Sequence, residues 1–306
     1  LPDGLVMRNT LRMSNINTLA SRLPFWIQVT RLDRPVGWIV LLWPTWIALA
    51  MAAKQTNWSI TLWLIFTAGV ILTRSAGCVV NDLTDRDFDR HVKRTRTRPL
   101  TAGHMTVREA AVLAIALLSL AFGLVLLTNL NTIALSVLAV ILAVVYPWLK
   151  RVTFWPQIGL GLAFSMAIPM AFSAHNAPID AIVACLFIGN VAWTLAYDTF
   201  YAMVDRDDDL KIGVKSTAIA LGRFDLLGIG IAQCIALGAF TTAFWLAEVH
   251  PISYVGVLFA AGFAIHQQRI AADRSREHCF QAFLQNHRFG ASLFMGVLLD
   301  AMLQFL

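Results

Sequence analysis

Charged residues are scarce in this chain: Asp, Glu, Lys and Arg make up 14% of its 306 residues, and 58% are hydrophobic. A soluble domain carries about 25% charged residues, so this scarcity excludes an ordinary soluble protein. The apolar residues form blocks long enough to cross the roughly 30 Å hydrocarbon core of a bilayer as helices. The predicted spans are residues 35–53, 58–80, 107–127, 132–149, 155–174, 178–200, 226–247, 251–268 and 288–306. We therefore expect an all-α polytopic membrane protein, with about nine transmembrane helices around a central cavity.

The chain also has few cysteines, and they are scattered. None belongs to a CxxC pair or a Cys/His cluster, which excludes a disulfide framework and a zinc site. We expect free, buried thiols at Cys78, Cys185, Cys234 and Cys279. Residues 1–34 lack the apolar run of a cleavable signal peptide. We interpret them as a polar, basic cytoplasmic arm, and residues 35–306 as a single transmembrane domain.

The positive charges are unevenly distributed between the predicted loops. With nine spans, 22 of the 24 lysines and arginines lie on one side of the membrane, and the exceptions are Lys54 and Arg74. Loops rich in Lys and Arg face the cytoplasm. The N-terminus is therefore predicted in the cytoplasm and the C-terminus outside, and the net charge of +6 reflects membrane topology and not nucleic-acid binding.

Half of the acidic residues lie in two short segments at the cytoplasmic ends of predicted spans. The first acidic segment is residues 81–89 and the second is residues 198–209, and together they contain nine of the 18 carboxylates. Asp82 and Asp198 are 116 residues apart, as are Asp89 and Asp205, which suggests two related halves with a central site between them. Carboxylates beside a bilayer are unfavourable unless positive charge balances them, so we expect a functional role.

The helical period divides each acidic segment into two faces. At about 100° per residue, Asp87 and Asp207 point away from the other aspartates and are predicted to be solvated. The residues that share a face, if the helices continue, are Asn81, Asp82, Asp85 and Asp89 in the first segment and Asp198, Tyr201, Asp205, Asp208 and Asp209 in the second. We predict that Asn81 and these aspartates are metal ligands, because facing carboxylates repel one another without a cation between them. Oxygen ligands, few per ion, favour Mg²⁺, which also binds phosphate groups.

Basic residues follow each acidic segment. They are Lys93, Arg94, Arg96 and Arg98 after the first segment, and Lys211 and Lys215 after the second. Carboxylates with a metal ion, together with Lys and Arg, can hold a diphosphate and stabilise it as a leaving group. A diphosphate in a membrane cavity indicates a polyprenyl diphosphate, because its tail can lie among apolar helices. The alternative is that these residues form only a solvated cytoplasmic loop.

Several motifs resemble those of the UbiA-type membrane prenyltransferases. Asn81-Asp82-x-x-Asp85-x-x-x-Asp89 is similar to their first aspartate motif, and residues 197–217 are similar to their second. Shorter matches lie at residues 33–37, 74–78, 93–95, 98–100 and 146–151. The resemblance covers most of the chain, from about residue 31 to 222, whereas the N-terminal arm and the last two spans carry no matching motif. The extended second motif is most similar to that of members acting on 4-hydroxybenzoate in the ubiquinone pathway.

The resemblance implies a nine-helix enzyme of a bacterial inner membrane that joins a polyprenyl diphosphate to 4-hydroxybenzoate. It implies one Mg²⁺ on Asn81, Asp85 and Asp89 and a second on Asp198, Asp205 and Asp209, the five aspartates being the catalytic residues. It also implies contacts from Arg98, Lys150 and Tyr146 to the diphosphate. Ionisation of the C–O bond would give an allylic cation that the ring attacks ortho to its hydroxyl, before a base removes the ring proton. Further candidates for substrate binding are Lys93, Arg94, Tyr201, Lys211 and Lys215.

Arg74 lies about seven residues inside a predicted span, where a charged side chain is costly unless it is paired. One interpretation is a structural partner for an aspartate of the first acidic segment. The other is a clamp for the carboxylate of the benzoate, which a planar guanidinium binds well. Arg34 is a second candidate for this role, although near the interface it could equally extend into the headgroup region. Tyr146 and Lys150 lie one helical turn apart and share a face, a pair that is also typical of an interface anchor.

Two other functional classes compete with this interpretation. A cation- or proton-coupled transporter would carry acidic residues in the middle of its spans, whereas here they lie at helix ends beside many cations. A second alternative is a prenyltransferase with another acceptor, such as homogentisate, dihydroxynaphthoate, a chlorin or haem. The extended second motif disfavours this alternative.

Overall fold

The computed structural model of the protein describes residues 21–90 and 95–303. Within these ranges the secondary structure is helical and contains no strand, as the long apolar runs predict. A helical segment covers residues 21–30. The later α-helices are α2 (Val36–Gln55), α3 (Ile60–Thr84), α4 (Arg86–Asp89), α5 (Val107–Val125), α6 (Leu130–Val152), α7 (Pro156–Ser165), α8 (Ala167–Ala174), α9 (Ala181–Ile212), α10 (Thr217–Leu221), α11 (Asp225–Leu246), α12 (Ser253–Ile270), α13 (Arg276–Leu284) and α14 (Asn286–Leu303).

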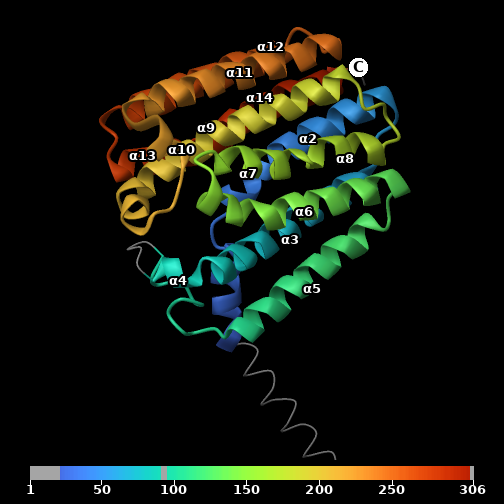
Figure 1. Ribbon diagram of the computed structural model, residues 1–306. Coiled ribbons are helices and arrows are strands. Elements are labelled where there is room, and N and C mark those ends of the chain that lie inside the picture. Colours follow the sequence, from blue (N-terminus) through green and yellow to red (C-terminus); the bar gives the residue numbers. More distant parts are fainter. Residues whose placement is uncertain (1–20, 91–94, 304–306) are drawn as a thin grey trace, which may run out of the picture.

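The long helices pack as a bundle in which spatial neighbours are often distant in the sequence (Figure 1). α9 packs against both α7 and α11, and α14 packs against both α2 and α12. α3 packs closely on α5, whereas α5 makes few contacts with α6 and diverges from it in Figure 1. This arrangement brings the ends of α3 and α9, which carry the two acidic segments, to the same end of the bundle.

A helix occupies each of the nine predicted spans. Seven stretches of the described chain are long and apolar enough to cross a membrane: 36–55, 60–84, 107–125, 130–152, 156–174, 181–212 and 217–246. The eighth and ninth predicted spans correspond to α12 and α14, helices of 18 residues each that are less apolar than these seven. The all-α membrane fold is therefore confirmed, and the count of nine transmembrane helices stays a prediction.

The fifth predicted span is not one continuous helix. It is divided at Met166 into α7 and α8. Proline has no backbone N–H, so Pro169 cannot donate the helical hydrogen bond to the carbonyl of Ser165. The loss of this bond, three residues beyond the break, accounts for the interruption.

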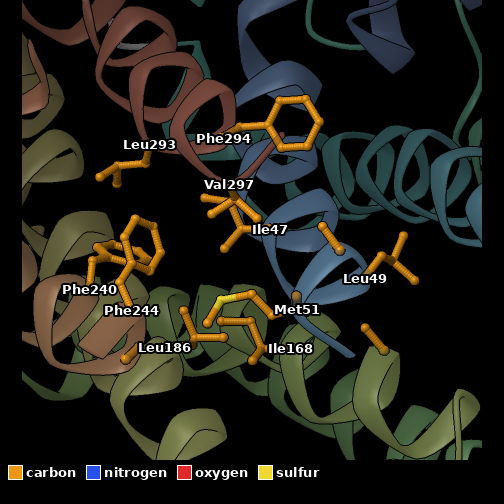
Figure 2. Close-up of a cluster of buried hydrophobic side chains, with 14 of the residues drawn as sticks. Ile47, Leu49, Met51, Ile168, Leu186, Phe240, Phe244, Leu293, Phe294 and Val297 are labelled. Carbon is orange, nitrogen blue, oxygen red and sulfur yellow. The ribbon is translucent and has the colours of Figure 1, made fainter. Parts of the chain in front are cut away.

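A large cluster of buried apolar side chains extends toward the end of the bundle opposite the acidic segments. There Ile47 and Met51 of α2, Leu186 of α9, Phe240 of α11 and Leu293 of α14 belong to one buried cluster (Figure 2). Few side chains of α5 and α6 are buried, and large apolar ones are exposed on both helices. An exposed apolar surface of this kind fits contact with lipid. The fold thus combines a buried apolar core with a site at one end of the bundle.

The four cysteines are free, as predicted. Cys78 and Cys279 are buried, but Cys185 is only partly buried and Cys234 is exposed. The expectation that all four are buried was therefore wrong for the last two. Apolar spans expose one side to lipid, so an apolar neighbourhood in the sequence does not by itself imply burial in the protein.

Candidate functional site

A cavity of about 1670 Å³ opens among the helices, and both acidic segments contribute to its wall. From the first segment it is lined by Asn81, Asp82, Asp85 and Asp89, and from the second by Asp198, Asp205 and Asp209. The remaining wall is largely apolar and comes from α2, α3, α5, α6, α7, α8 and α13. Residues of both acidic segments thus line the same cavity. A charged end and an apolar wall suit a ligand with an anionic head and a hydrocarbon tail.

The first acidic segment is built from a helix end, a break and a short helix. α3 continues past residue 80, as expected, and ends at Thr84. Asp85 follows with φ −95° and ψ 4°, and its N–H still donates to the carbonyl of Asn81 at 2.9 Å. α4 begins directly afterwards, so Asp89 returns to the same side as Asp85. The predicted face is thus preserved although the helix is interrupted.

Asp82 is enclosed by two arginines. Its side chain is 1% exposed, and one terminal nitrogen of Arg31 lies 2.8 and 2.9 Å from its two oxygens. A nitrogen of Arg98 lies 2.9 Å from Asp82 and 2.7 Å from Asp89. Two guanidinium groups therefore compete with any metal for the Asp82 carboxylate. Arg31 was not singled out from the sequence, because its partner lies 51 residues away.

Burial dominates the electrostatics of Asp85 and Asp89. Burial raises the pKa of Asp85 above its usual value, although Lys150, whose Nζ lies 3.7 Å away, opposes this effect. Burial likewise raises the pKa of Asp89, against the opposing influence of Arg98. A raised pKa means that nearby cations do not fully compensate the negative charge of these carboxylates. Additional positive charge, such as a metal ion, would therefore bind here favourably.

The second acidic segment lies inside one continuous helix. α9 has 32 residues, runs 12 residues beyond the predicted end of its span, and stops at Gly213. Gly213 has φ +73°, a left-handed conformation that glycine adopts without steric cost. Asp198, Tyr201, Asp205 and Asp209 repeat every three or four residues along this helix and all line the cavity.

The prediction that Asp208 shares this face was wrong. Asp208 does not line the cavity; instead, its carboxylate lies 3.0 Å from a terminal nitrogen of Arg276 at the start of α13. One residue corresponds to about 100° of rotation around a helix, so Asp208 points to α13 when Asp209 points into the cavity. Asp207 is 73% exposed, as predicted for the outer face.

The predicted basic residues are divided between the cavity and the surface. Arg34, Arg74, Arg98, Lys150 and Lys215 line the cavity. Lys211 does not: its side chain is 75% exposed and lies near Asp208 at 3.8 Å. Its predicted contact with substrate has no support in this geometry. Lys93 and Arg94 lie outside the described residues.

Lys215 joins the loop after α9 to the end of α6. Its backbone N–H donates to the carbonyl of Lys150 at 3.0 Å, and its Nζ donates to the carbonyl of Val152 at 3.1 Å. Lys150 itself lies 5.7 Å from the centre of the Tyr146 ring, one turn earlier on α6. These contacts place Tyr146, Lys150 and Lys215 together at the charged end of the cavity.

Arg74 has no carboxylate partner among the described residues. Its Nε donates to the carbonyl of Gly37 at 3.3 Å, one terminal nitrogen lies 2.9 Å from Cys78 Sγ, and its guanidinium lies 5.9 Å from the Phe164 ring centre. The interpretation as a structural partner for an aspartate is therefore not supported. A half-buried guanidinium that lines the cavity without an ion pair is suited to an anionic ligand.

An aromatic wall lies beside the second acidic segment, and of its members only Tyr201 was singled out from the sequence. The rings of Tyr201 and Phe283 are 4.8 Å apart, and Phe280 and Tyr197 lie within 6.4 Å of members of this pair. All four residues line the cavity. Phe280 and Phe283 belong to α13, a short helix in a loop between the last two predicted spans. No periodic pattern marks them, because only the packing of α13 on α9 brings them to the site.

The donor set of the cavity suits a divalent ion bound jointly by protein and ligand. No three His, Cys, Asp or Glu side chains in the described ranges lie close enough to hold a metal by themselves. The carboxylates lie along two walls of one cavity, so each ion would take few protein ligands and complete its shell with phosphate oxygens and water. Mg²⁺ binds in this way. The predicted donors thus fit Mg²⁺ together with a diphosphate.

Comparisons with known proteins agree with this site. The sequence pattern of the UbiA prenyltransferase family matches residues 41–295. The 4-hydroxybenzoate octaprenyltransferase of Chromohalobacter salexigens is 49% identical over 292 residues, covering 92% of this chain and 94% of the relative. The enzyme of the same name from Tolumonas auensis is 49% identical over 276 residues, covering 90% and 96%.

Two solved structures share the fold. A UbiA homologue from Aeropyrum pernix K1 superposes with a TM-score of 0.75 at 23% identity, over 88% of this chain and 98% of that one. A UbiA homologue from Archaeoglobus fulgidus bound to GPP and Mg²⁺ gives a TM-score of 0.67 at 21% identity, over 89% and 99%. These similarities establish the arrangement of the helices.

Proposed function

The chain belongs to the UbiA prenyltransferase family, and from this premise we propose that it transfers a polyprenyl group from polyprenyl diphosphate to 4-hydroxybenzoate. The new bond forms on the ring ortho to the hydroxyl, diphosphate is released, and the product enters ubiquinone biosynthesis. The names and the high coverage of the bacterial relatives support this substrate pair. The protein is an integral membrane enzyme with several apolar helices.

One observation carries the proposal: carboxylates from both acidic segments and several basic groups line one cavity that continues along an apolar wall. A transporter would need charges along a path across the membrane, whereas these charges gather at one end of the bundle. The apolar wall has room for a hydrocarbon tail. The geometry therefore supports an enzyme for an amphiphilic diphosphate better than a transporter.

The diphosphate head binds at the charged end of the cavity. Lys150 and Tyr146 on α6 lie beside Asp85, so a phosphate oxygen near Asp85 meets both an ammonium and a phenol. Arg98 bridges Asp82 and Asp89, which fixes its guanidinium at the edge of the same site. Asp82, enclosed by Arg31 and Arg98, orients Arg98 in this arrangement and is not a direct metal ligand.

Mg²⁺ is the divalent ion that the donor set favours. Asn81, Asp85 and Asp89 would hold one ion, and Asp198, Asp205 and Asp209 a second. When bound, the ions offset the negative charge of the diphosphate and so make it a better leaving group. The Archaeoglobus homologue bound to GPP and Mg²⁺, and the same homologue bound to Cd²⁺, support the use of divalent ions.

In the reaction, the bond between C1 of the prenyl chain and the bridging oxygen breaks, and its electron pair leaves with the diphosphate. The allylic cation is held beside the rings of Tyr201 and Phe283, whose π faces attract positive charge. The ring carbon ortho to the hydroxyl attacks C1, and a base then removes the proton from that carbon. Lys150 and Arg98 retain the diphosphate while its negative charge develops.

Arg74 binds the carboxylate of 4-hydroxybenzoate. Its guanidinium lines the cavity and is engaged only by a carbonyl, a thiol and an aromatic ring. Arg34 is a weaker candidate because its side chain is 72% exposed. By the distribution of Lys and Arg, the charged end of the cavity lies on the cytoplasmic side of a bacterial inner membrane, where soluble aromatic acids are available.

The test uses membranes that contain the protein, with octaprenyl diphosphate and a panel of aromatic acceptors. We expect 3-octaprenyl-4-hydroxybenzoate to form in the presence of Mg²⁺ and its formation to stop when EDTA is added. Homogentisate and dihydroxynaphthoate serve as competing acceptors. Product from one of these acceptors, with none from 4-hydroxybenzoate, would replace the proposed acceptor but keep the prenyl transfer. No product from any acceptor would reject the enzymatic proposal.

A further inference from the structure

The carboxylate of Asp225 is fully buried at the start of α11 and binds two arginines from distant parts of the chain. A terminal nitrogen of Arg206 lies 2.5 Å from Asp225 Oδ2, and Nε of Arg274 lies 3.0 Å from Oδ1. The N–H of Leu226 also donates to Oδ1, and the first turn of a helix favours an acidic group. Separating these elements would leave a buried charge without its partner. This is energetically unfavourable, so the buried ion pairs hold the elements together.

Arg206 belongs to the second acidic segment itself. It lies between Asp205, which lines the cavity, and Asp207, which is exposed. Successive side chains are about 100° apart around a helix, so Arg206 leaves α9 toward α11 while Asp205 faces the cavity. The ion pair with Asp225 therefore restrains the rotation of the part of α9 that carries Asp205 and Asp209.

Arg274 brings the start of α13 to the same point. Its φ is +57°, in the left-handed region that residues other than glycine rarely adopt. A terminal nitrogen of Arg274 donates to the carbonyl of Arg223 at 3.1 Å, just before α11. Two residues later, Arg276 binds Asp208 of α9 at 3.0 Å. α13 is thus tied to α11 through Asp225 and to α9 through Asp208.

These contacts lie directly behind the site. α13 also carries Phe280 and Phe283, which line the cavity beside Tyr201 of α9. The same ties that restrain α9 therefore hold the aromatic wall against it. Asp225 does not line the cavity, so its influence on a ligand is indirect.

We propose that Asp225 is a positioning residue for the second acidic segment. By binding Arg206 and Arg274 at once, it fixes the rotation of α9 so that Asp205 and Asp209 meet the metal–diphosphate ligand, and it holds α13 in place beside them. This proposal rests on the function proposed above, because it assumes that these aspartates bind a metal together with a diphosphate.

Asp300 provides a matched control. It is also a buried aspartate, 4% exposed, and it binds Lys54 Nζ at 3.2 Å and the N–H of His250 at 2.6 Å. His250 follows the far end of α11, about 30 Å along that helix from Asp225. Replacing Asp300 with Asn removes a buried charge of the same kind but leaves the ties of α9 intact.

The experiment measures binding of Mn²⁺, used in place of Mg²⁺, to detergent-solubilised full-length protein in the presence of inorganic diphosphate, by electron paramagnetic resonance. Loss of a group that orients metal ligands typically weakens binding about 10-fold or more, and we expect this loss for Asp225→Asn. For Asp300→Asn we expect a change of less than about 2-fold, because Lys54 and His250, which its carboxylate binds, do not line the cavity. Equal changes in the two variants, or no change in either, overturn the proposal.

A milder variant covers the case in which Asp225→Asn does not fold. Arg274→Gln removes one of the two guanidinium groups that bind Asp225. The Arg274 side chain is 39% exposed, so its replacement should disturb the fold less. Since Arg206 still holds Asp225, we expect binding of Mn²⁺ to weaken about 3-fold, below the 10-fold loss of an orienting group. Unchanged binding in a folded Arg274→Gln protein contradicts the proposal.

Failure of the proposal and failure of the function give different results. If unmodified protein binds Mn²⁺ with diphosphate but forms no prenylated product, the function is wrong while the positioning role is still measured by the variants. If the unmodified protein forms the prenylated product and the Asp225→Asn protein binds Mn²⁺ as tightly as the unmodified protein, the function stands and the positioning role is wrong. If unmodified protein binds no Mn²⁺ with diphosphate, both fail together.

Discussion

The two acidic segments look alike in the sequence but are built in different ways. The first combines the end of α3, a break at Asp85 and the four residues of α4. The second lies within α9, which continues without interruption to Ile212. In the first segment, Asp82, Asp85 and Asp89 form ion pairs with Arg31, Arg98 and Lys150 around the cavity. The second is held by ion pairs on the side away from the cavity. Arg276 binds Asp207 and Asp208, and Arg206 of the segment binds Asp225.

This difference shows that two constructions can deliver carboxylates to one cavity. In a continuous helix the face is set by rotation alone, so every third or fourth residue reaches the site and the rest are available for anchoring. In an interrupted segment the break resets the direction of the chain, and contacts from other loops must fix each side chain. The second segment should therefore depend on its packing against α11 and α13, and the first on its ion pairs.

The largest effect is expected from removing one carboxylate of each segment. Asp85→Ala and Asp205→Ala should each lower turnover of 4-hydroxybenzoate by about 100-fold or more, because stabilisation of the leaving group is lost. Expression in the membrane should be unchanged. The measurement is turnover per mole of protein quantified in the same membranes. Unchanged turnover in both variants would contradict the metal assignment, and a loss in only one would show that a single segment binds the ion.

Arg74 tests whether the interior of α3 and its acidic end serve different substrates. Arg74→Ala should raise KM for 4-hydroxybenzoate about 10-fold or more, since a hydrogen bond to a charged group contributes about 1.5–3 kcal/mol. KM for the polyprenyl diphosphate should change little. Steady-state kinetics with each substrate varied separately gives both values. The reverse pattern would assign Arg74 to the diphosphate together with the first acidic segment.

A smaller effect is expected at Asp208, which distinguishes the two faces of α9. Asp208→Asn should change turnover by less than about 3-fold, because this partly exposed ion pair with Arg276 contributes on the order of 1 kcal/mol. Asp209→Asn is the matched neighbour and should lose activity about as strongly as Asp205→Ala. Equal losses at Asp208 and Asp209 would mean that α9 presents a wider face to the cavity than the structure shows.

The smallest effect is expected at Gly213, where α9 ends. A methyl group added there meets no atom within 4 Å, so Gly213→Ala should cost only the backbone strain of a left-handed residue, about 1 kcal/mol of unfolding free energy. Asp85, at the break of the first segment, has a negative φ and needs no glycine. Equilibrium unfolding in mixed micelles gives the cost. No loss of stability would show that α9 does not end in this conformation.

The positions of the helices could be predicted from the sequence, because long apolar runs leave few other structures in a membrane. The end of α9 could not, since the apolar run stops near residue 200 while the helix continues through charged residues to Ile212. The composition of a segment predicts where the chain leaves the hydrocarbon core of the membrane, but it does not predict where the helix itself ends. The interruption at Met166 was missed for a related reason: one proline in an apolar run can bend a helix or divide it.

Within each acidic segment, the helical period was enough to predict most of the residues that line the cavity. Asn81, Asp85, Asp89, Asp198, Asp205 and Asp209 line the cavity as expected. The period gives the direction of a side chain but not the neighbour it meets, which is why Asp208 was placed on the wrong face. Arg31, Phe283 and Asp225 were missed because each acts through a partner that only the tertiary packing supplies.

The uneven packing of the bundle has a consequence for its internal motions. Local unfolding is rarest where buried apolar contacts are densest. The cluster around Met51, Leu186 and Phe240 lies at the end opposite the acidic segments, so amide hydrogens there should exchange with solvent most slowly. Amides around α4 and α13 should exchange faster, and a diphosphate with its metal ions should slow them most. Ligand binding would then stabilise the part of the protein that is least rigid in the absence of ligand.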